Sequence, residues 1–154
     1  MTQRIDYAKA APQGVAALRG IEKYVRHCGL AESLLNLVRM RASQINGCAF
    51  CLDMHSKDAR AAGESEARLY VLPAWRETDF YSNRERAALE WTEAVTRVSD
   101  GQVPDAIYER AAQNFTDKEL ADLTFAIIAI NGWNRLAIPF RTPAGSYQPA
   151  RMPK

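Results

Sequence analysis

Apolar residues recur every three or four positions through most of the chain, with polar residues between them. Residues at this spacing share one face of an α-helix, whereas a half-buried strand alternates apolar and polar side chains at every second position. No segment shows convincing alternation, and Asn46-Gly47 lies between two helical segments, where it indicates a helix-to-helix turn. The pattern therefore predicts an all-α fold.

Prolines, glycines and helix caps divide this pattern into separate helices. Ser82 and Thr116 are each followed three residues later by a glutamate, which is the spacing of a capping box and predicts a helix start. The expected helices cover about residues 12–28, 31–45, 48–63, 66–72, 83–98, 104–114 and 117–135. Helices of this length are stable only when their apolar faces pack together, so we expect a compact multi-helix domain.

The prolines at positions 139, 143 and 149 predict a different structure for the end of the chain. Proline lacks a backbone N–H and disrupts a helix interior. We therefore expect an extended tail over residues 138–154 that either wanders or packs on a neighbouring subunit. The length suits one domain, because domains commonly hold about 100–200 residues. We expect a single domain over residues 1–154 whose core covers about residues 12–137.

Composition narrows the range of functions. Apolar residues make up 47% of the chain and charged residues 25%, which suits a protein that buries a core. The net charge of +2 does not suggest a surface built to bind nucleic acid. The N-terminus lacks the apolar stretch of a signal peptide, and the longest apolar run, residues 125–130, is too short for a bilayer, which needs about 20 residues. We expect a soluble, cytoplasmic protein without nucleic-acid or membrane partners.

The three cysteines carry the clearest chemistry. An odd count with one close pair does not fit a secreted disulfide framework. Cys48 and Cys51 form a C-x-x-C motif, and His55 follows four residues after Cys51. On a helix these three side chains share one face near the N-terminus, where backbone N–H groups favour negative charge. Because such a site lowers a thiol pKa from about 8.5 to roughly 3.5–7.5, the motif predicts a redox-active dithiol.

Two-electron redox chemistry suits such a pair. One thiolate attacks a peroxide or a disulfide, and the other resolves the resulting sulfenic acid or mixed disulfide. The helix-terminus argument favours Cys48 as the thiol of lower pKa. Two other interpretations stay open from the residues: a zinc site that Cys28 or His27 would complete, and a pair of buried structural cysteines.

The residues around the cysteine pair resemble a known family. The stretch from Leu37 to His55, which contains the C-x-x-C-x-x-x-H core, is similar to the AhpD-like alkylhydroperoxidase branch of the carboxymuconolactone decarboxylase family. Further segments extend the resemblance over most of residues 30–137: residues 57–63, 70–78, 85–89 and 131–135. A C-x-x-C motif alone does not identify a family, but the C-x-x-C-x-x-x-H core within these surrounding residues is fairly specific for this one.

The resemblance implies an all-helical fold that assembles into homo-oligomers, commonly trimers or hexamers. It also implies a thiol peroxidase or disulfide reductase activity without haem, flavin or metal. In the family's usual scheme Cys51 attacks the peroxide, Cys48 resolves the product and His55 belongs to a proton relay. The reducing equivalents come from a dithiol protein or a dihydrolipoyl group. The resemblance and the helix-terminus argument therefore differ on which cysteine is the more reactive.

One position departs from the family pattern. The family places a glutamate of the proton relay twelve residues before the first cysteine, and this chain has Asn36 there. An amide can orient a water or an imidazole, but it cannot take up a proton at neutral pH. Glu32, one helical turn earlier, is a candidate partial substitute. The departure predicts a weaker or differently tuned peroxidase, unless Asn36 is simply a polar helix residue.

These observations predict a thiol-dependent peroxidase or dithiol oxidoreductase that reduces organic hydroperoxides in antioxidant defence. The alternatives are a lactone decarboxylase of the same family and a non-catalytic redox sensor or zinc-stabilised module. Aromatic residues are expected in the core or a subunit interface, or along a channel for an organic peroxide: Trp75, Trp91, Trp133, Phe80, Tyr81 and Phe125. Asn134 and Arg135, near the end of the last expected helix, should form a satisfied polar pair or a cap.

Overall fold

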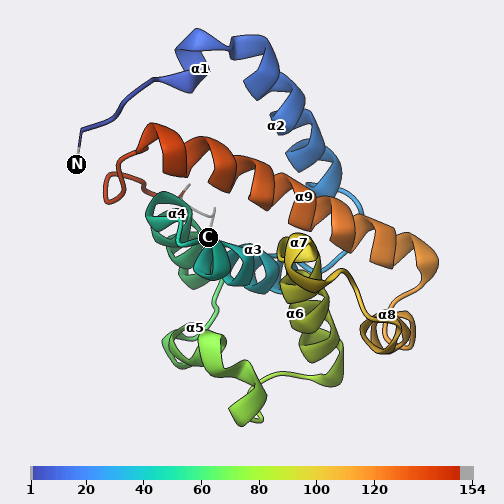
Figure 1. The fold of residues 1–154 in the computed structure, drawn as a ribbon. Coiled ribbons are helices and arrows are strands. Elements are labelled where there is room, and N and C mark those ends of the chain that lie inside the picture. The colour runs from blue at the N-terminus through green and yellow to red at the C-terminus, as the bar shows by residue number, and fades with distance from the viewer. Residues whose placement is uncertain (1, 150–154) are drawn as a thin grey trace.

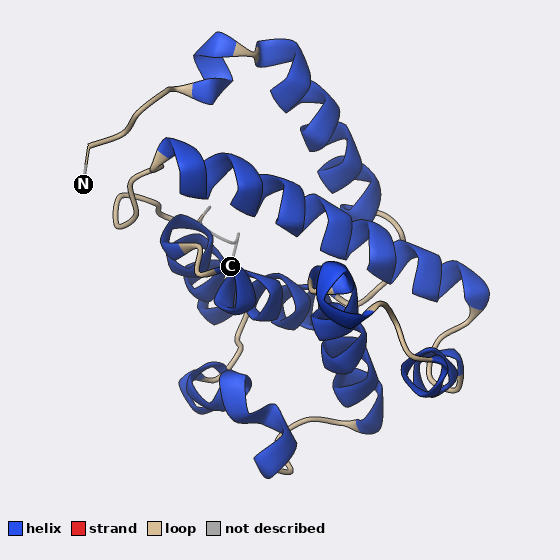
Figure 2. Ribbon diagram, in the orientation of Figure 1, coloured by secondary structure: helices blue, strands red, loops and turns tan. Residues whose placement is uncertain are grey.

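The computed structural model describes residues 2–149, and over that range its regular elements are helices joined by loops (Figure 2). The elements are α1 (Tyr7–Ala10), α2 (Pro12–Arg26), α3 (Glu32–Asn46), α4 (Ala49–Ala61), α5 (Glu66–Val71), the 3₁₀ helix η1 (Leu72–Glu77), α6 (Asn83–Thr96), α7 (Val98–Gly101), α8 (Asp105–Ala112) and α9 (Asp117–Phe140). The prediction of an all-α fold is confirmed. The short helices α1 and α7 were not expected from the sequence.

Local signals in the sequence fix several helix ends. Ser82 and Thr116 both form complete capping boxes, with their side chains accepting from the backbone N–H of Glu85 and Glu119. Gly47 ends α3 with a left-handed φ of 68°, a conformation that glycine adopts without steric cost. That turn sends the chain directly into α4, so the expected helix-to-helix turn at Asn46-Gly47 is confirmed.

The core is built around α3, which packs against α4, α6 and α9. In Figure 1, α2 (blue) runs along α9 (orange to red), and the two helices are in contact. One buried cluster joins α2, α3, α6, α8 and α9 through residues such as Val25, Leu35 and Ile127. A second cluster joins α3, η1 and α6 through Leu37 and Trp75. The faces of α2 and α4 that do not pack into these two clusters line a cavity.

The last helix extends beyond the predicted end at residues 134–135 and includes Pro139. Proline has no backbone N–H, so a proline inside a helix removes one backbone hydrogen bond. In the final turn the helix loses only that one bond. Arg141 then ends the helix in a left-handed conformation, and its N–H reaches the carbonyls of Ala137 and Ile138. The prediction that Asn134 and Arg135 lie near the helix end is therefore wrong, because both lie inside α9.

The tail also differs from its prediction. The chain after α9 turns back and contacts α4 of the same chain, rather than wandering. Lys57 donates to the carbonyls of Gly145 and Tyr147, and the Gly145 N–H donates to Asp53 at 3.0 Å. The Tyr147 hydroxyl donates to Asp58 at 2.6 Å. The predicted tail residues 150–154 lie outside the described residues.

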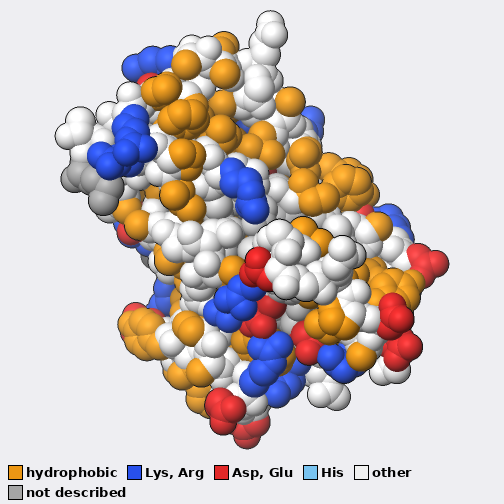
Figure 3. All heavy atoms as spheres, in the orientation of Figure 1, with side chains coloured by type: hydrophobic (Ala, Val, Ile, Leu, Met, Phe, Trp, Pro, Cys, Tyr) orange, Lys and Arg blue, Asp and Glu red, His pale blue; other side chains and the backbone are white. Residues whose placement is uncertain are grey.

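The surface mixes charged and apolar side chains (Figure 3). In the lower half of that view, blue and red side chains lie next to one another. Ion pairs join neighbouring elements of the fold, including Arg76–Glu93 and Arg110–Glu90. Across residues 2–149, no helix has the length and apolar character needed to cross a membrane.

The aromatic residues divide between the core and the surface. Trp75, Trp91 and Tyr81 are buried, as expected for core aromatics. Phe80 and Phe125 are about half exposed. Trp133 is partly buried and, as shown below, lines the cavity beside the cysteine pair.

Candidate functional site

Cys48 is the residue that begins α4. It has an extended backbone, and its carbonyl accepts the first helical hydrogen bond from the Leu52 N–H at 2.9 Å. The Cys48 N–H donates back to the Ser43 carbonyl at 3.0 Å, which fixes the turn between α3 and α4. Cys51 follows in the first turn of α4, and His55 lies one turn later. The predicted position of the motif at a helix N-terminus is therefore confirmed.

The two cysteines are buried in an apolar wall between α4 and α9. Each is 1% exposed, and neither forms a disulfide in this structure. Ala42 of α3 and Ile130 and Ala137 of α9 pack around them, with Phe50 and Trp133 at the margin. The pair is therefore held by packing on both sides and cannot turn freely toward solvent.

The two thiols have opposite pKa shifts. The Cys51 thiol donates a hydrogen bond to Cys48, and this bond lowers the pKa of Cys48 to about 7, with further help from the backbone N–H groups of Cys51 and Phe50. Donating that bond, together with burial, raises the pKa of Cys51 above its ordinary value. The first proton of the pair is therefore lost near neutral pH, and the negative charge that results lies on Cys48. This agrees with the helix-terminus argument made from the sequence.

A cavity of about 1110 Å³ opens against the cysteine pair. Cys51 and His55 line it, whereas Cys48 is not part of its lining. Apolar side chains are part of the cavity lining, including Val15, Phe50, Met54, Trp133 and Ala137. A ligand in the cavity would therefore meet Cys51 first, although Cys48 carries the charge. Its volume suits an organic molecule of moderate size.

His55 faces this cavity as a neutral imidazole. The residue is 7% exposed, and its Nε2 atom has no hydrogen-bond partner among the residues that the structure describes. Burial, followed by the positive charges of Arg39 and Arg26, lowers the pKa of His55 to about 3. A buried polar atom without a partner is costly in a folded protein, so its presence here indicates a place for a ligand atom.

The position of the family's relay glutamate is filled by a neutral residue next to a buried cation. Asn36 lies on α3 and lines the cavity, with 3% of its surface exposed. Arg39, one turn later, donates to Glu32 at 2.8 Å and lies 3.5 Å from Glu22 of α2. Glu32 is therefore engaged by Arg39, and the structure does not place it as a proton partner of His55.

The residues of the zinc hypothesis do not come together. Cys28 follows α2 and packs against the large core cluster, while His27 caps the end of α2 and contacts the Lys23 carbonyl. Within the described part of the chain, no group of three His, Cys, Asp or Glu residues is arranged to hold a metal ion. Cys28 is thus a packing residue, as its isolated position in the sequence suggested.

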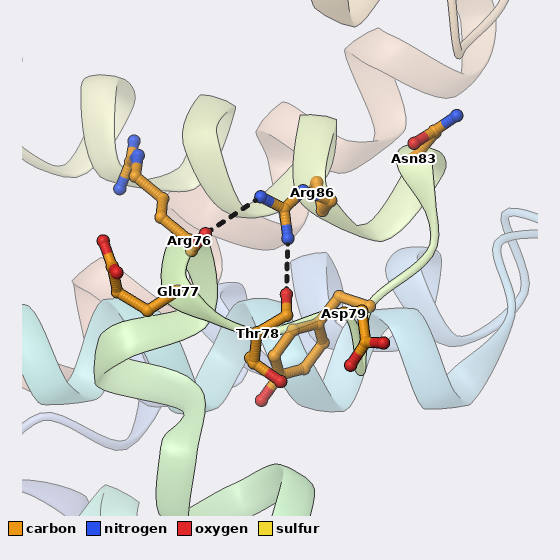
Figure 4. A pocket seen from close by; sticks show the side chains of 7 residues that line it. Arg76, Glu77, Thr78, Asp79, Asn83 and Arg86 are labelled. Atoms are coloured by element: carbon orange, nitrogen blue, oxygen red, sulfur yellow. Dashed lines mark hydrogen bonds between the residues drawn. The ribbon is translucent and has the colours of Figure 1, made fainter.

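A second hollow, of about 530 Å³, lies at the η1–α6 loop (Figure 4). Arg86 points into it and donates to the carbonyls of Thr78 at 2.9 Å and Arg76 at 3.3 Å. These bonds hold the loop between the two helices. The lining contains neither cysteine nor histidine, so we assign the chemistry to the cavity beside Cys51.

Sequence reasoning did not assign two residues to the site, although it named Asn134 as a polar helix residue. Arg39 acts on His55 through its charge, and Asn134 is fully buried next to both sulfurs. A signal for Asn134 exists in the sequence: it lies four residues after Ile130 and three before Ala137 on an otherwise apolar helix face. The predicted end of the helix at residues 134–135 concealed that signal.

Comparisons with known proteins place the chain in a family. The model of the carboxymuconolactone decarboxylase family matches residues 10–94. The uncharacterized protein YdfG of Bacillus subtilis is 42% identical over 95% of this chain and 99% of its own length. A crystal structure from Agrobacterium tumefaciens, of a protein of unknown function suggested to be the antioxidant defence protein AhpD, is also 42% identical. It covers 95% of this chain and all of its own, with a TM-score of 0.91.

The fold extends to more distant proteins. The debrominase Bmp8 has a TM-score of 0.80 at 19% identity, over 90% of this chain and 74% of that one. At this identity the likeness concerns the fold alone. The family match and the close relatives together show that the chain belongs to the carboxymuconolactone decarboxylase family and has an AhpD-like fold.

Proposed function

We propose that the protein is a thiol-dependent peroxidase that reduces organic hydroperoxides through the Cys48–Cys51 dithiol. The observation that carries the proposal is the position of Cys51, which lines a large, partly apolar cavity beside a neutral, unpartnered His55. Behind it, Cys48 has a pKa of about 7 and accepts the Cys51 proton. The likeness to a protein suggested to act in antioxidant defence supports the same conclusion.

The first step forms a bond between the Cys51 sulfur and one peroxide oxygen. As Cys51 attacks, its proton passes to the Cys48 thiolate, with which it already shares a hydrogen bond. The O–O bond breaks, Cys51 becomes a sulfenic acid, and the alkoxide takes up a proton from solvent and leaves as an alcohol. The unpartnered Nε2 atom of His55 is available to hydrogen-bond the peroxide and hold it against the sulfur.

The second step closes the disulfide. The Cys48 sulfur attacks the Cys51 sulfur of the sulfenic acid, and the departing hydroxide leaves as water after taking up the Cys48 proton. The balance is one hydroperoxide, one thiol, one thiolate and one proton from solvent in, and one alcohol, one water and one disulfide out. A dithiol protein or a dihydrolipoyl group then reduces the disulfide by exchange. We also propose that the protein works as a homo-oligomer, as the AhpD-like branch commonly does.

Turnover with cysteine variants tests the proposal. The purified protein should reduce cumene hydroperoxide with dihydrolipoamide as the electron donor. Cys48→Ser and Cys51→Ser should each lower the rate by at least about 1,000-fold, because each removes a reacting sulfur. Cys28→Ser is the matched control and should keep full activity, since Cys28 packs away from the cavity.

Mass spectrometry supplies the second measurement. After one equivalent of peroxide, Cys48 and Cys51 should be joined in an intramolecular disulfide while Cys28 stays free for alkylation. Undiminished peroxide turnover in both serine variants would overturn the proposal. Conversion of a carboxymuconolactone by the double serine variant would point to lactone chemistry instead.

A further inference from the structure

Asn134 occupies the part of α9 that faces the cysteine pair. It is fully buried, and its helix neighbours Ile130 and Ala137 pack in the same cluster as Cys48 and Cys51. A buried carboxamide has two different ends, an oxygen that accepts hydrogen bonds and an NH₂ group that donates them. Which end faces the sulfurs decides whether the residue favours a thiol or a thiolate.

The orientation of Asn134 follows from a chain of side chains that begins at Asn131. Arg135 donates to Asn131 Oδ1 at 2.7 Å, and a guanidinium has donors only. Asn131 Nδ2 donates to the Ile127 carbonyl at 2.9 Å, and a carbonyl only accepts. Two independent partners therefore fix the Asn131 amide with its oxygen at the end that Arg135 contacts.

Asn46 of α3 links Asn131 and Asn134 of α9 through hydrogen bonds and so fixes the orientation of the Asn134 amide. Its Nδ2 group donates to Asn131 Oδ1 at 2.9 Å and to Asn134 Oδ1 at 2.8 Å, so both amide hydrogens are used. The oxygen of Asn134 must then face Asn46. A reversed Asn134 would set one NH₂ group against another and leave a buried donor unpaired, which costs about 1–3 kcal/mol.

The NH₂ group of Asn134 is consequently directed to the opposite side, where Ser43 and the two sulfurs lie. It donates to Ser43 Oγ at 3.3 Å, which leaves one of its two hydrogens for the cysteine pair. The bond between the two thiols and their burial have the largest effects on the pair, and the Asn134 side chain has a smaller one that lowers the pKa of both Cys48 and Cys51.

We propose that Asn131, Asn46 and Asn134 form a polarised amide chain that holds the Asn134 NH₂ group toward the dithiol, making Asn134 the positioning residue that stabilises the thiolate. A neutral amide suits this place because a buried lysine or arginine would add an isolated charge, which is costly away from water. The consequence for turnover rests on the proposed function, but the orientation and its effect on the thiols do not.

The test measures how the rate of iodoacetamide alkylation depends on pH, in a Cys28→Ser background so that the pair alone reacts. Asn134→Leu keeps the shape of the side chain and removes the donor. It should raise the pH midpoint of alkylation by about one unit from a value near 7, which makes the reaction at pH 7 roughly fivefold slower. Asn46→Leu releases the orientation without changing Asn134 itself, and it should move the midpoint in the same direction by less.

Thr96→Val is the matched control. It removes a hydrogen bond of similar length from the far side of the network, since Asn131 Nδ2 donates to Thr96 Oγ1 at 3.1 Å. The Ile127 carbonyl and Arg135 still fix Asn131, so this variant should lose some stability and keep the wild-type midpoint. An unchanged midpoint in Asn134→Leu, with a thermal shift like that of Thr96→Val, would overturn the proposal.

Two further outcomes stay informative. If Asn134→Leu fails to fold, the test rests on Asn46→Leu. A wild-type pH midpoint of alkylation in Asn46→Leu would overturn the proposal. The alkylation assay contains no peroxide, so a shifted midpoint in a protein that reduces no hydroperoxide would support the amide chain while rejecting the proposed function.

Discussion

Two buried polar regions of this protein differ in how completely their hydrogen bonds are satisfied. Glu93 of α6 accepts from Arg41 at 2.8 Å, Trp75 at 2.8 Å and Arg76 at 2.7 Å, so its carboxylate is fully engaged. His55 is buried more deeply than Glu93, yet its Nε2 atom has no partner in the described residues. The first region joins α3, η1 and α6 and serves the fold. The second leaves an atom free for a ligand.

The difference shows that burial of a polar group alone does not identify a functional residue. A buried group whose partners are all supplied by the chain stabilises one arrangement of helices. A buried polar group that lacks a partner lowers the stability of the fold. Such groups occur at functional sites, where a bound molecule supplies the missing hydrogen bond. Substitutions in the two regions should therefore have opposite signatures, and the following predictions go from the largest effect to the smallest.

His55→Leu should separate activity from stability. We expect peroxide turnover to fall by about 100-fold, because the group proposed to hold the peroxide against the Cys51 sulfur is lost. The free energy of unfolding should stay the same or rise, since leucine removes a buried polar atom that has no partner. Turnover and urea denaturation of the same preparation measure both quantities. A clear loss of stability would contradict the contrast with Glu93.

Glu93→Gln should show the reverse. The substitution keeps the shape of the side chain but leaves Arg41 and Arg76 without their carboxylate. We expect the free energy of unfolding to fall by about 2 kcal/mol, with turnover per folded molecule unchanged. Urea denaturation provides the measurement. An activity loss that exceeds the loss of folded protein would show that this region also serves the reaction.

The two regions should also lose stability in different pH windows. The pKa of His55 falls from 6.5 to about 3 on folding, so the unfolded chain gains a proton first and stability declines as pH drops below 6.5. The pKa of Glu93 lies below its ordinary 4.5 in the folded state, through bonds from Trp75, Arg76 and Arg41 that outweigh its burial. Its stabilisation is therefore present above pH 4.5 and is lost as pH falls further.

Unfolding measured as a function of pH can separate the two contributions. His55→Leu should flatten the decline that begins near pH 6.5 and leave the more acidic decline in place. Glu93→Gln should flatten only the decline below pH 4.5. An unchanged profile between pH 6.5 and 4.5 in His55→Leu would mean that the imidazole is charged in the folded protein.

Asn36→Glu makes the smallest change and restores the residue of the family pattern. A carboxylate on that wall of the cavity should raise the pKa of His55 from about 3, because it offsets the positive charge of Arg39. We expect a severalfold increase in turnover, with the His55 titration followed by NMR. Asn36→Gln is the neutral control. Equal rates and equal titrations in the two variants would show that this position does not tune the reaction.

The sequence predicted the local features of this protein well, because their causes lie within a few residues of one another. The capping boxes at Ser82 and Thr116, the left-handed turn at Gly47 and the helix that begins at Cys48 all depend on neighbours along the chain. Helical spacing also predicted a shared face for Cys48, Cys51 and His55; Cys51 and His55 line the same cavity, whereas Cys48, whose backbone is extended, does not line it. These features were enough to indicate the chemistry.

Tertiary structure decided what surrounds the dithiol. The partners of Asn134 on α3 lie about 90 positions away, and Lys57 contacts the tail residue Tyr147 across 90 positions. Contacts of that separation depend on how α3, α4 and α9 pack, which no local pattern specifies. The sequence by itself determined that a cysteine pair starts a helix. Only the packing decided that Cys51 meets the cavity, that His55 Nε2 has no partner in the part of the chain that the structure describes, and that Asn134 is fully buried on α9 with its amide hydrogen-bonded to Asn46 and Ser43 of α3.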